Sequence, residues 1–85
     1  MKIRKKNYGD CNLIGKNVEQ LRLQKKISQK SFIAQLQSAG LDINPTSYSK
    51  LEGQIRLATD KEVDTIAKVL GIGVEELFAN ADINN

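Results

Sequence analysis

Residues 28–56 read SQKSFIAQLQSAGLDINPTSYSKLEGQIR, the pattern of two short helices joined through a glycine turn. Ser28 is placed to cap the first helix, which ends near Gly40. Asn44 and Pro45 begin the second, because Asn accepts hydrogen bonds from first-turn amides and Pro suits the first helical position. This stretch predicts the centre of a helical bundle.

The helix that begins at Pro45 has two contrasting faces. Tyr48, Leu51 and Ile55 recur at spacings of three and four, which predicts an apolar stripe that packs inward. Thr and Ser are mediocre helix formers, so stability alone does not explain the outward face. Short polar side chains and a lysine suit close approach to DNA, while an ordinary solvated face is the competing interpretation. The outward residues are Thr46, Ser47, Ser49 and Lys50.

Three further segments carry helical patterns. Residues 13–26 place apolar residues on one face. Thr59 and Glu62 form a capping box for a helix that stops at Gly71, and a short helix follows over 74–78. We expect an all-α fold, a compact five-helix bundle without strands. The expected core residues are Phe32, Leu36, Tyr48, Leu51, Ile66, Leu70, Leu77 and Phe78.

The chain of 85 residues is expected to form one domain over residues 13–80. Residues 1–12 lack periodic apolar positions and read as a flexible basic arm, and residues 81–85 as a frayed tail. A few apolar residues fit the core stripe less well and are candidates for a homodimer surface, although isolated exposed leucines are normal in monomers. They are Leu13, Leu23, Leu57 and Ile83.

Composition restricts the possible chemistry. With one cysteine and no histidine, neither a disulfide framework nor a zinc site is expected, and no cofactor. There are no clustered carboxylates and no glycine-rich phosphate loop, so we expect no enzyme and no small-molecule substrate. No apolar run could span a bilayer or serve as a secretory signal, so we expect no membrane partner and a cytoplasmic location.

The net charge of +3 is unevenly distributed. Residues 1–30 hold nine Lys or Arg against two acids, a balance of +7, and residues 57–85 hold two lysines against six acids, a balance of −4. Such a gradient would orient the molecule in the field of a polyanion, whereas two solvated surfaces are the plain alternative. The cluster Lys2, Arg4, Lys5 and Lys6 could follow a DNA backbone or enter a minor groove.

Over residues 13–79 the chain resembles the lambda-repressor-like domain of the Cro and xenobiotic-response-element helix-turn-helix family. The resemblance implies that the third helix of five enters the major groove, usually from a two-fold symmetric dimer on a palindromic operator. It rests on the following residues in order: Ile14-Gly15, Leu21-Arg22, Ser28-Gln29, Ser49-Lys50-Leu51-Glu52, Arg56, Ile66-Ala67, Leu70-Gly71-Ile72 and Glu76-Leu77.

The resemblance also implies residue roles. Gln29 corresponds to a residue that contacts the sugar-phosphate backbone and buttresses the third helix, and Arg22 and Glu52 correspond to an ion pair that holds this helix at its angle. The chain departs from the family at Gln54, where a glycine is usual, and at Pro45, where phage repressors often have a base-contacting side chain. Because of these departures, the operator sequence cannot be inferred from the family.

We therefore expect double-stranded DNA as the partner of a sequence-specific regulator, most simply a repressor. Thr46, Ser49 and Lys50 are the candidates for base contacts. Phosphate contacts are expected from five residues, each with a plainer structural alternative such as a helix cap or a surface ion pair: Ser28, Gln29, Asn44, Ser47 and Arg56. The alternative function is a protein-interaction module that uses the same bundle without DNA.

Overall fold

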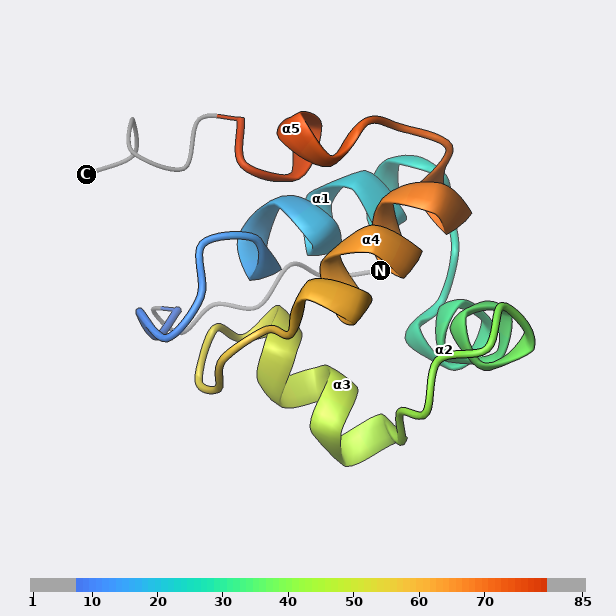
Figure 1. The fold of residues 1–85 in the computed structure, drawn as a ribbon, viewed down its shortest axis with the longest axis horizontal. Helices are drawn as coiled ribbons and strands as arrows, with labels where there is room; N and C mark the ends of the chain where they lie inside the picture. Colours follow the sequence, from blue (N-terminus) through green and yellow to red (C-terminus); the bar gives the residue numbers. More distant parts are fainter. Residues whose placement is uncertain (1–7, 80–85) are drawn as a thin grey trace.

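The computed structural model describes residues 8–79, and within them the chain forms five helices and no strand (Figure 1). In chain order the helices are α1 (Gly15–Gln24), α2 (Gln29–Ser38), α3 (Pro45–Glu52), α4 (Asp60–Leu70) and α5 (Val74–Leu77). Helix α3 contacts both α1 and α2, while α4 packs on α1, α2 and α5. The all-helical, compact fold expected from the sequence is confirmed.

Short polar side chains begin three of the helices, as predicted. The Ser28 hydroxyl accepts a hydrogen bond from the amide of Ser31 at 3.1 Å, and Asn44 Oδ1 accepts one from the amide of Ser47 at 2.8 Å. Thr59 forms a complete capping box with Glu62 at the start of α4. Each cap satisfies a backbone donor that has no partner inside its helix.

Twelve apolar side chains form one buried core among the described residues. At its centre the rings of Phe32 and Tyr48 meet edge to face, with centroids 5.8 Å apart, so α2 and α3 share an aromatic contact. Seven of the eight expected core residues are buried there. The core consists of Ile14, Val18, Phe32, Ile33, Leu36, Ile43, Tyr48, Leu51, Ile66, Ala67, Leu70 and Leu77.

Two residues expected to pack inward are exposed. Ile55 is 59% exposed because α3 ends at Glu52 and Gln54, with a φ of 60°, turns the chain away from the helical path. Phe78 is 40% exposed because α5 ends at Leu77, so the next side chain leaves the buried face. Helical periodicity predicts a face only as far as the helix continues.

The segment before α1 is fixed where the sequence predicted a flexible arm. The amides of Gly9 and Cys11 donate to the carbonyls of Gly53 and Gln54, each at 2.9 Å. Residues 9–12 therefore belong to the folded domain. The basic cluster of the expected arm and the expected frayed tail, with Ile83, lie outside the described residues. No helix within 8–79 is long and apolar enough to cross a membrane.

Candidate nucleic-acid interface

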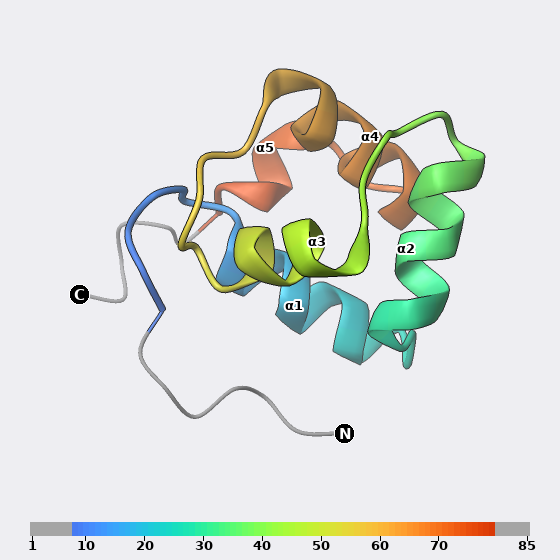
Figure 2. The same cartoon turned by 90° about the horizontal axis from the view of Figure 1, so that it is seen from below.

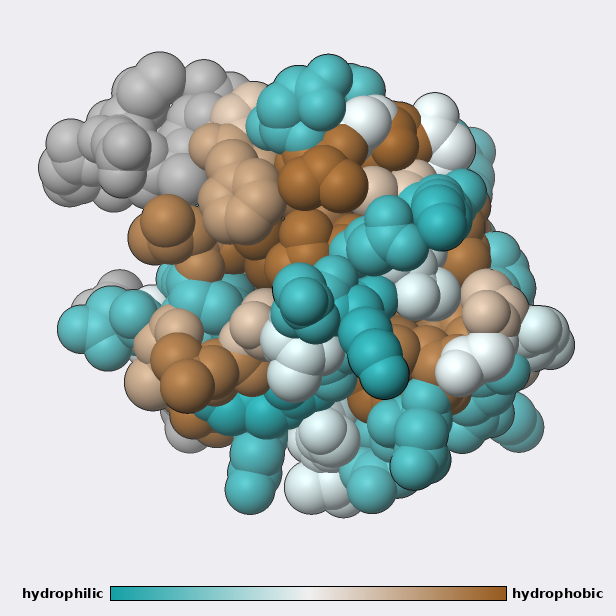
Figure 3. Space-filling view, in the orientation of Figure 1, coloured by the Kyte–Doolittle hydropathy of each residue, from teal (hydrophilic) through white to brown (hydrophobic). Residues whose placement is uncertain are grey.

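Helix α3 presents one buried and one open face. Tyr48, Leu51 and Glu52 are fully buried, whereas Thr46 and Lys50 are exposed. Figure 2, which views the molecule from below, shows α3 crossing the front with no other helix before it. Figure 3 has the orientation of Figure 1, in which α3 lies in the lower part of the molecule. Polar side chains dominate this part of the surface, in agreement with the exposure of Thr46 and Lys50. The open face therefore carries side chains that can donate and accept hydrogen bonds.

The other polar residues of this face are only partly exposed. Ser47 and Ser49 are half-buried, and the Ser47 carbonyl accepts from Arg56 Nε at 2.9 Å. Asn44 is exposed at the start of α3, where its Oδ1 is used by the cap. Asn44 Nδ2 makes no hydrogen bond within residues 8–79, so this donor is available to an external acceptor. Thr46 and Lys50 thus protrude, and the serines lie closer to the backbone.

The amino end of α2 lies beside α3. Gln29, the first residue of α2, donates from Nε2 to Glu52 Oε1 across 2.9 Å. Its backbone amide and that of Lys30 belong to the first turn of α2, where amides have no intrahelical acceptor and the helix dipole is positive. The Ser28 hydroxyl caps this turn, which is the structural alternative to a phosphate contact. One side-chain bond therefore couples a potential anion seat to the last residue of α3.

Three exposed lysines flank that seat in the sequence. Lys25 and Lys26 precede the cap, and Lys30 follows it, all exposed. The sequence places these cations in the basic part of the charge gradient, and no motif in it assigns them to the interface. Their spacing around Ser28 was the available signal, because a helix amino end flanked by lysines is an anion-binding arrangement. They extend the candidate interface from α3 to the turn between α1 and α2.

Beneath the interface lies a buried network centred on Glu52. Arg22 donates from Nε to Glu52 Oε2 at 2.8 Å and from Nη2 to Oε1 at 3.2 Å, which confirms the implied pair. The Tyr48 hydroxyl donates to Oε2 at 2.6 Å. Burial and the neighbouring Glu52 charge raise the pKa of Tyr48, so the phenol stays protonated as a donor. The angle of α3 against α1 and α2 is thereby set by hydrogen-bonded charges.

The pKa of Arg22 also responds to this network. Burial would lower the pKa of the guanidinium, but the hydrogen bonds and charge of Glu52 outweigh burial and raise it. A third donor, Nη1, reaches the carbonyl of Ile27 at 2.7 Å, just before the cap of α2. Arg22 therefore joins α3 to the turn that carries the lysines.

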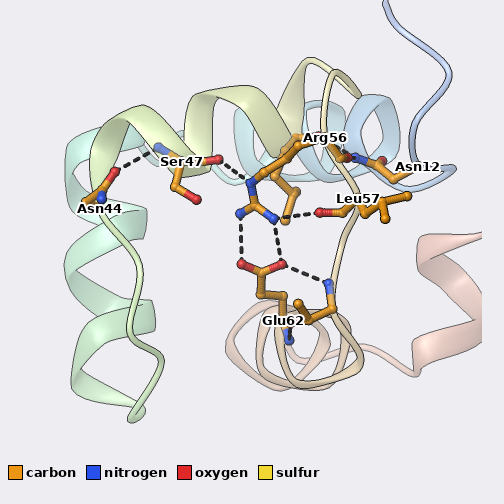
Figure 4. Close-up of polar contacts among 8 residues, drawn as sticks. Asn12, Asn44, Ser47, Arg56, Leu57 and Glu62 are labelled. Carbon is orange, nitrogen blue, oxygen red and sulfur yellow. Dashed lines mark hydrogen bonds and ion pairs between the residues drawn. The ribbon is translucent and has the colours of Figure 1, made fainter.

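Arg56, expected to contact phosphate, is occupied within the fold. Its Nη1 and Nη2 donate to the two carboxylate oxygens of Glu62 at 2.9 and 2.8 Å, and Nη1 also reaches the carbonyl of Leu57 (Figure 4). With Nε on Ser47, the guanidinium links α3 to the start of α4. Arg56 therefore forms the ion pair that was the alternative to a phosphate contact, and we do not include Arg56 in the interface.

Two residues that tie this region together were given no role from the sequence. Asn12 Nδ2 donates to the carbonyls of Leu51 and Arg56 at 3.0 and 2.9 Å. Gln54 links the residues before α1 to the first turn of α1. A hydrogen bond from an amide side chain to a distant backbone group leaves no periodic pattern in the sequence. The only signal was at Gln54, where the chain departs from the glycine that is usual in the family.

Comparison of the chain with protein-family models, with curated proteins and with solved structures gave no match. Within residues 8–79 no group of three His, Cys, Asp or Glu side chains is placed to hold a metal ion. The geometry of α2 and α3 is therefore the basis for assigning a function.

Proposed function

We propose that this protein is a sequence-specific DNA-binding regulator, most simply a repressor, in which α2 and α3 form a helix-turn-helix. The observation that carries the proposal is the bond from Gln29 to Glu52, which holds the amino end of α2 beside α3. A phosphate bound at α2 would then place the open face of α3 against base edges. Backbone binding and base reading would be joined in one rigid unit.

Base reading is assigned to Thr46, Ser49 and Lys50. Lys50 can donate to guanine O6 and N7, and Thr46 offers a hydroxyl or a methyl group to the major groove. Ser49 is short and half-buried, so it suits a position where the backbone of α3 comes close to a base. Pro45 removes a donor at the first helical position without loss to α3, because that amide has no intrahelical acceptor.

Phosphate binding is assigned to the amino end of α2, with Gln29 as its central side chain. The exposed Lys26 and Lys30 add positive charge on either side of Ser28. A second phosphate contact is assigned to Asn44 and Ser47 at the start of α3, where the Asn44 cap uses only Oδ1 and leaves the Nδ2 donor without a hydrogen bond to the described residues. These contacts would set the register of the protein on DNA without reading sequence.

A homodimer on a palindromic operator completes the proposal. Leu13 and Leu57 are 54% and 75% exposed, and Asn12 joins their two segments through its bond to the Arg56 carbonyl. Apolar side chains also gather toward the α3–α4 loop and α5 in Figure 3. Such a surface supports self-association, since exposed apolar groups favour burial against a partner.

Selection of bound duplexes from a random pool tests the function. We expect an inverted repeat, whose half-site spacing reports the dimer geometry, and a steep loss of affinity as salt increases. Recovery of no sequence, together with no binding to any duplex at low salt, would reject the proposal. A non-cognate duplex of the same length serves as the control for backbone binding.

A protein-interaction module is the second candidate. It is favoured by the exposed Val74 and Phe78 on and after α5, beside the acidic Glu75 and Glu76. This end of the molecule would repel DNA and suit a partner with basic and apolar groups. The same duplex titration separates the candidates, because a module of this kind would show no salt-dependent duplex affinity.

A further inference from the structure

The residues before α1 form a clasp on the carboxyl end of α3. We define the clasp as residues 9–12 together with Gln54. Gln54 Nε2 donates to the Gly9 carbonyl at 2.9 Å, and Gln54 Oε1 accepts from the Lys16 amide at 2.9 Å. With the two backbone bonds from Gly9 and Cys11, three hydrogen bonds join residues 9–12 to the turn after α3, and a fourth joins Gln54 to α1.

Gln54 adopts a backbone conformation that glycine would accept more easily. Its φ is 60°, in the left-handed region that disfavours side chains other than those of Asn and Asp. The glutamine amide offsets this strain, because it supplies both a donor and an acceptor to groups on two separate segments. The residue at this position is therefore explained by what its side chain holds together.

Asn12 closes the other side of the clasp. Its Oδ1 accepts from the amides of Ile14 and Gly15 at 3.1 and 2.9 Å, which satisfies the first turn of α1. Its Nδ2 donates to Leu51 in α3 and to Arg56 beyond it. One side chain thus joins the start of α1 to both sides of the turn that ends α3.

Two glycines allow the backbones to approach closely at this joint. A Cβ at Gly9 would lie 2.3 Å from the Gln54 carbonyl oxygen, and one at Gly15 would lie 2.4 Å from the Leu51 carbonyl oxygen. Both neighbours are backbone atoms, so a side chain could not be admitted without moving α3 or the clasp. The joint is rigid because it is backbone against backbone.

Tyr8 extends the attachment onto α1. Its hydroxyl donates to Glu19, and the Lys16 ammonium lies 5.9 Å from the centroid of its ring. The chain is therefore held at Tyr8 as well as at the clasp itself.

We propose that Gln54 is a positioning residue for DNA reading, and that the clasp acts by holding the carboxyl end of α3 rather than through charge. The inference rests on the proposed DNA-binding function. Helix α3 has eight residues, a length of about 12 Å. Binding groups need placement within about 0.5 Å, so a small tilt of so short a helix would displace Lys50 from a base edge.

A graded series at Gln54 tests this role. Gln54→Gly keeps the positive φ and removes both side-chain hydrogen bonds. Gln54→Asn tolerates the positive φ, but its side chain is too short to reach both partners. Gln54→Glu retains the acceptor for the Lys16 amide and loses the donor to the Gly9 carbonyl. We expect affinity for the selected duplex to fall about tenfold in the Gly and Asn variants, and at least as far in the Glu variant, whose carboxylate oxygen would face the Gly9 carbonyl in place of the amide donor. Gln24→Ala, at an exposed position on α1, is the matched control and should bind as the unsubstituted protein does.

Two further readouts separate positioning from a general structural effect. Affinity for the non-cognate duplex and the slope of log affinity against log salt should both stay unchanged, because every phosphate-binding group remains in place. Amide exchange at Gly9 and Cys11 should accelerate by about tenfold or more in Gln54→Gly, since the clasp opens more often. Loss of cognate and non-cognate binding in equal proportion would overturn the positioning role.

The failure of this inference differs from that of the proposed function. If the unsubstituted protein binds no duplex, both are wrong. If it binds its selected duplex and the Gln54 series binds equally well, the DNA-binding function stands and the positioning role is wrong.

Discussion

Arg22 and Glu52 form an ion pair in the interior of the protein, with 2.8 Å between Nε and Oε2 and side chains only 4% and 0% exposed. The two residues are thirty positions apart and belong to α1 and α3. Glu52 also accepts from Gln29 of α2 and from Tyr48. The carboxylate at the end of α3 is therefore the meeting point of three helices.

Removal of one partner of this pair should destabilise the fold strongly. Glu52→Ala leaves the Arg22 guanidinium buried without its carboxylate, and we expect a loss of about 3–5 kcal/mol in the free energy of unfolding. Urea denaturation measures this. Asp64→Ala in the exposed Asp64–Lys68 pair is the control, with an expected change of at most about 1 kcal/mol. An unchanged denaturation midpoint for Glu52→Ala would show that the pair does not hold the helices.

Acid should weaken the bridge between α3 and α4. Burial would raise the pKa of Glu62, but hydrogen bonds from Arg56 and from the Thr59 amide outweigh it and hold this pKa below the ordinary 4.5. A depressed pKa contributes stability that is present above the unfolded value and is lost as the pH falls through the folded value. We expect the difference in stability between the protein and Glu62→Gln to shrink below about pH 4.5. Thermal melts over pH 3–7 measure it, and a constant difference would contradict the assignment.

Lys50 should determine preference at one base pair of the operator. Lys50→Ala removes the only cation on the open face of α3, and we expect about 1–3 kcal/mol less discrimination at a single position. Repeating the duplex selection measures the preference at every position. Lys61→Ala, an exposed lysine on α4, should leave the selected sequence as it was. An identical sequence from Lys50→Ala would show that this lysine is merely solvated.

The basic residues that precede Tyr8 are expected to act through charge. Removal of residues 1–7 leaves the clasp in place and should lower the slope of log affinity against log salt by about 0.9 for each phosphate that the protein no longer neutralises. Titrations at several salt concentrations measure the slope. This outcome is the opposite of that expected for Gln54→Gly, which should change affinity without changing the slope. An unaltered slope would dismiss a role for these residues.

Leu57 should contribute to self-association on the operator. Leu57→Glu places a charge on a side chain that is 75% exposed, so the monomer fold should be retained. We expect weaker binding to a duplex with two half-sites and unchanged binding to a single half-site. Gel-shift titrations of the two duplexes measure the difference. Equal loss on both duplexes would contradict a dimer contact at this residue.

Several features could be predicted from short stretches of sequence. Ser28, Asn44 and Thr59 bond amides within one turn of their own position, so the cap depends on local geometry alone. The core stripe of α3 follows from helical periodicity. The pair of Arg22 and Glu52 was implied by resemblance, because no local rule joins residues thirty positions apart.

The tertiary structure decided the features that depend on where distant segments meet. Residues 9–12 have no helical or apolar pattern, yet they are held by backbone groups after α3 that the sequence does not reveal as neighbours. In the sequence, Arg56 cannot be distinguished from an arginine that binds phosphate. In the folded protein Glu62 lies beside it, and the guanidinium forms an ion pair with this carboxylate. Local hydrogen bonding and periodicity operate within a few residues and can be read from the chain. The partners of a surface arginine or a glutamine amide are set only when the helices pack.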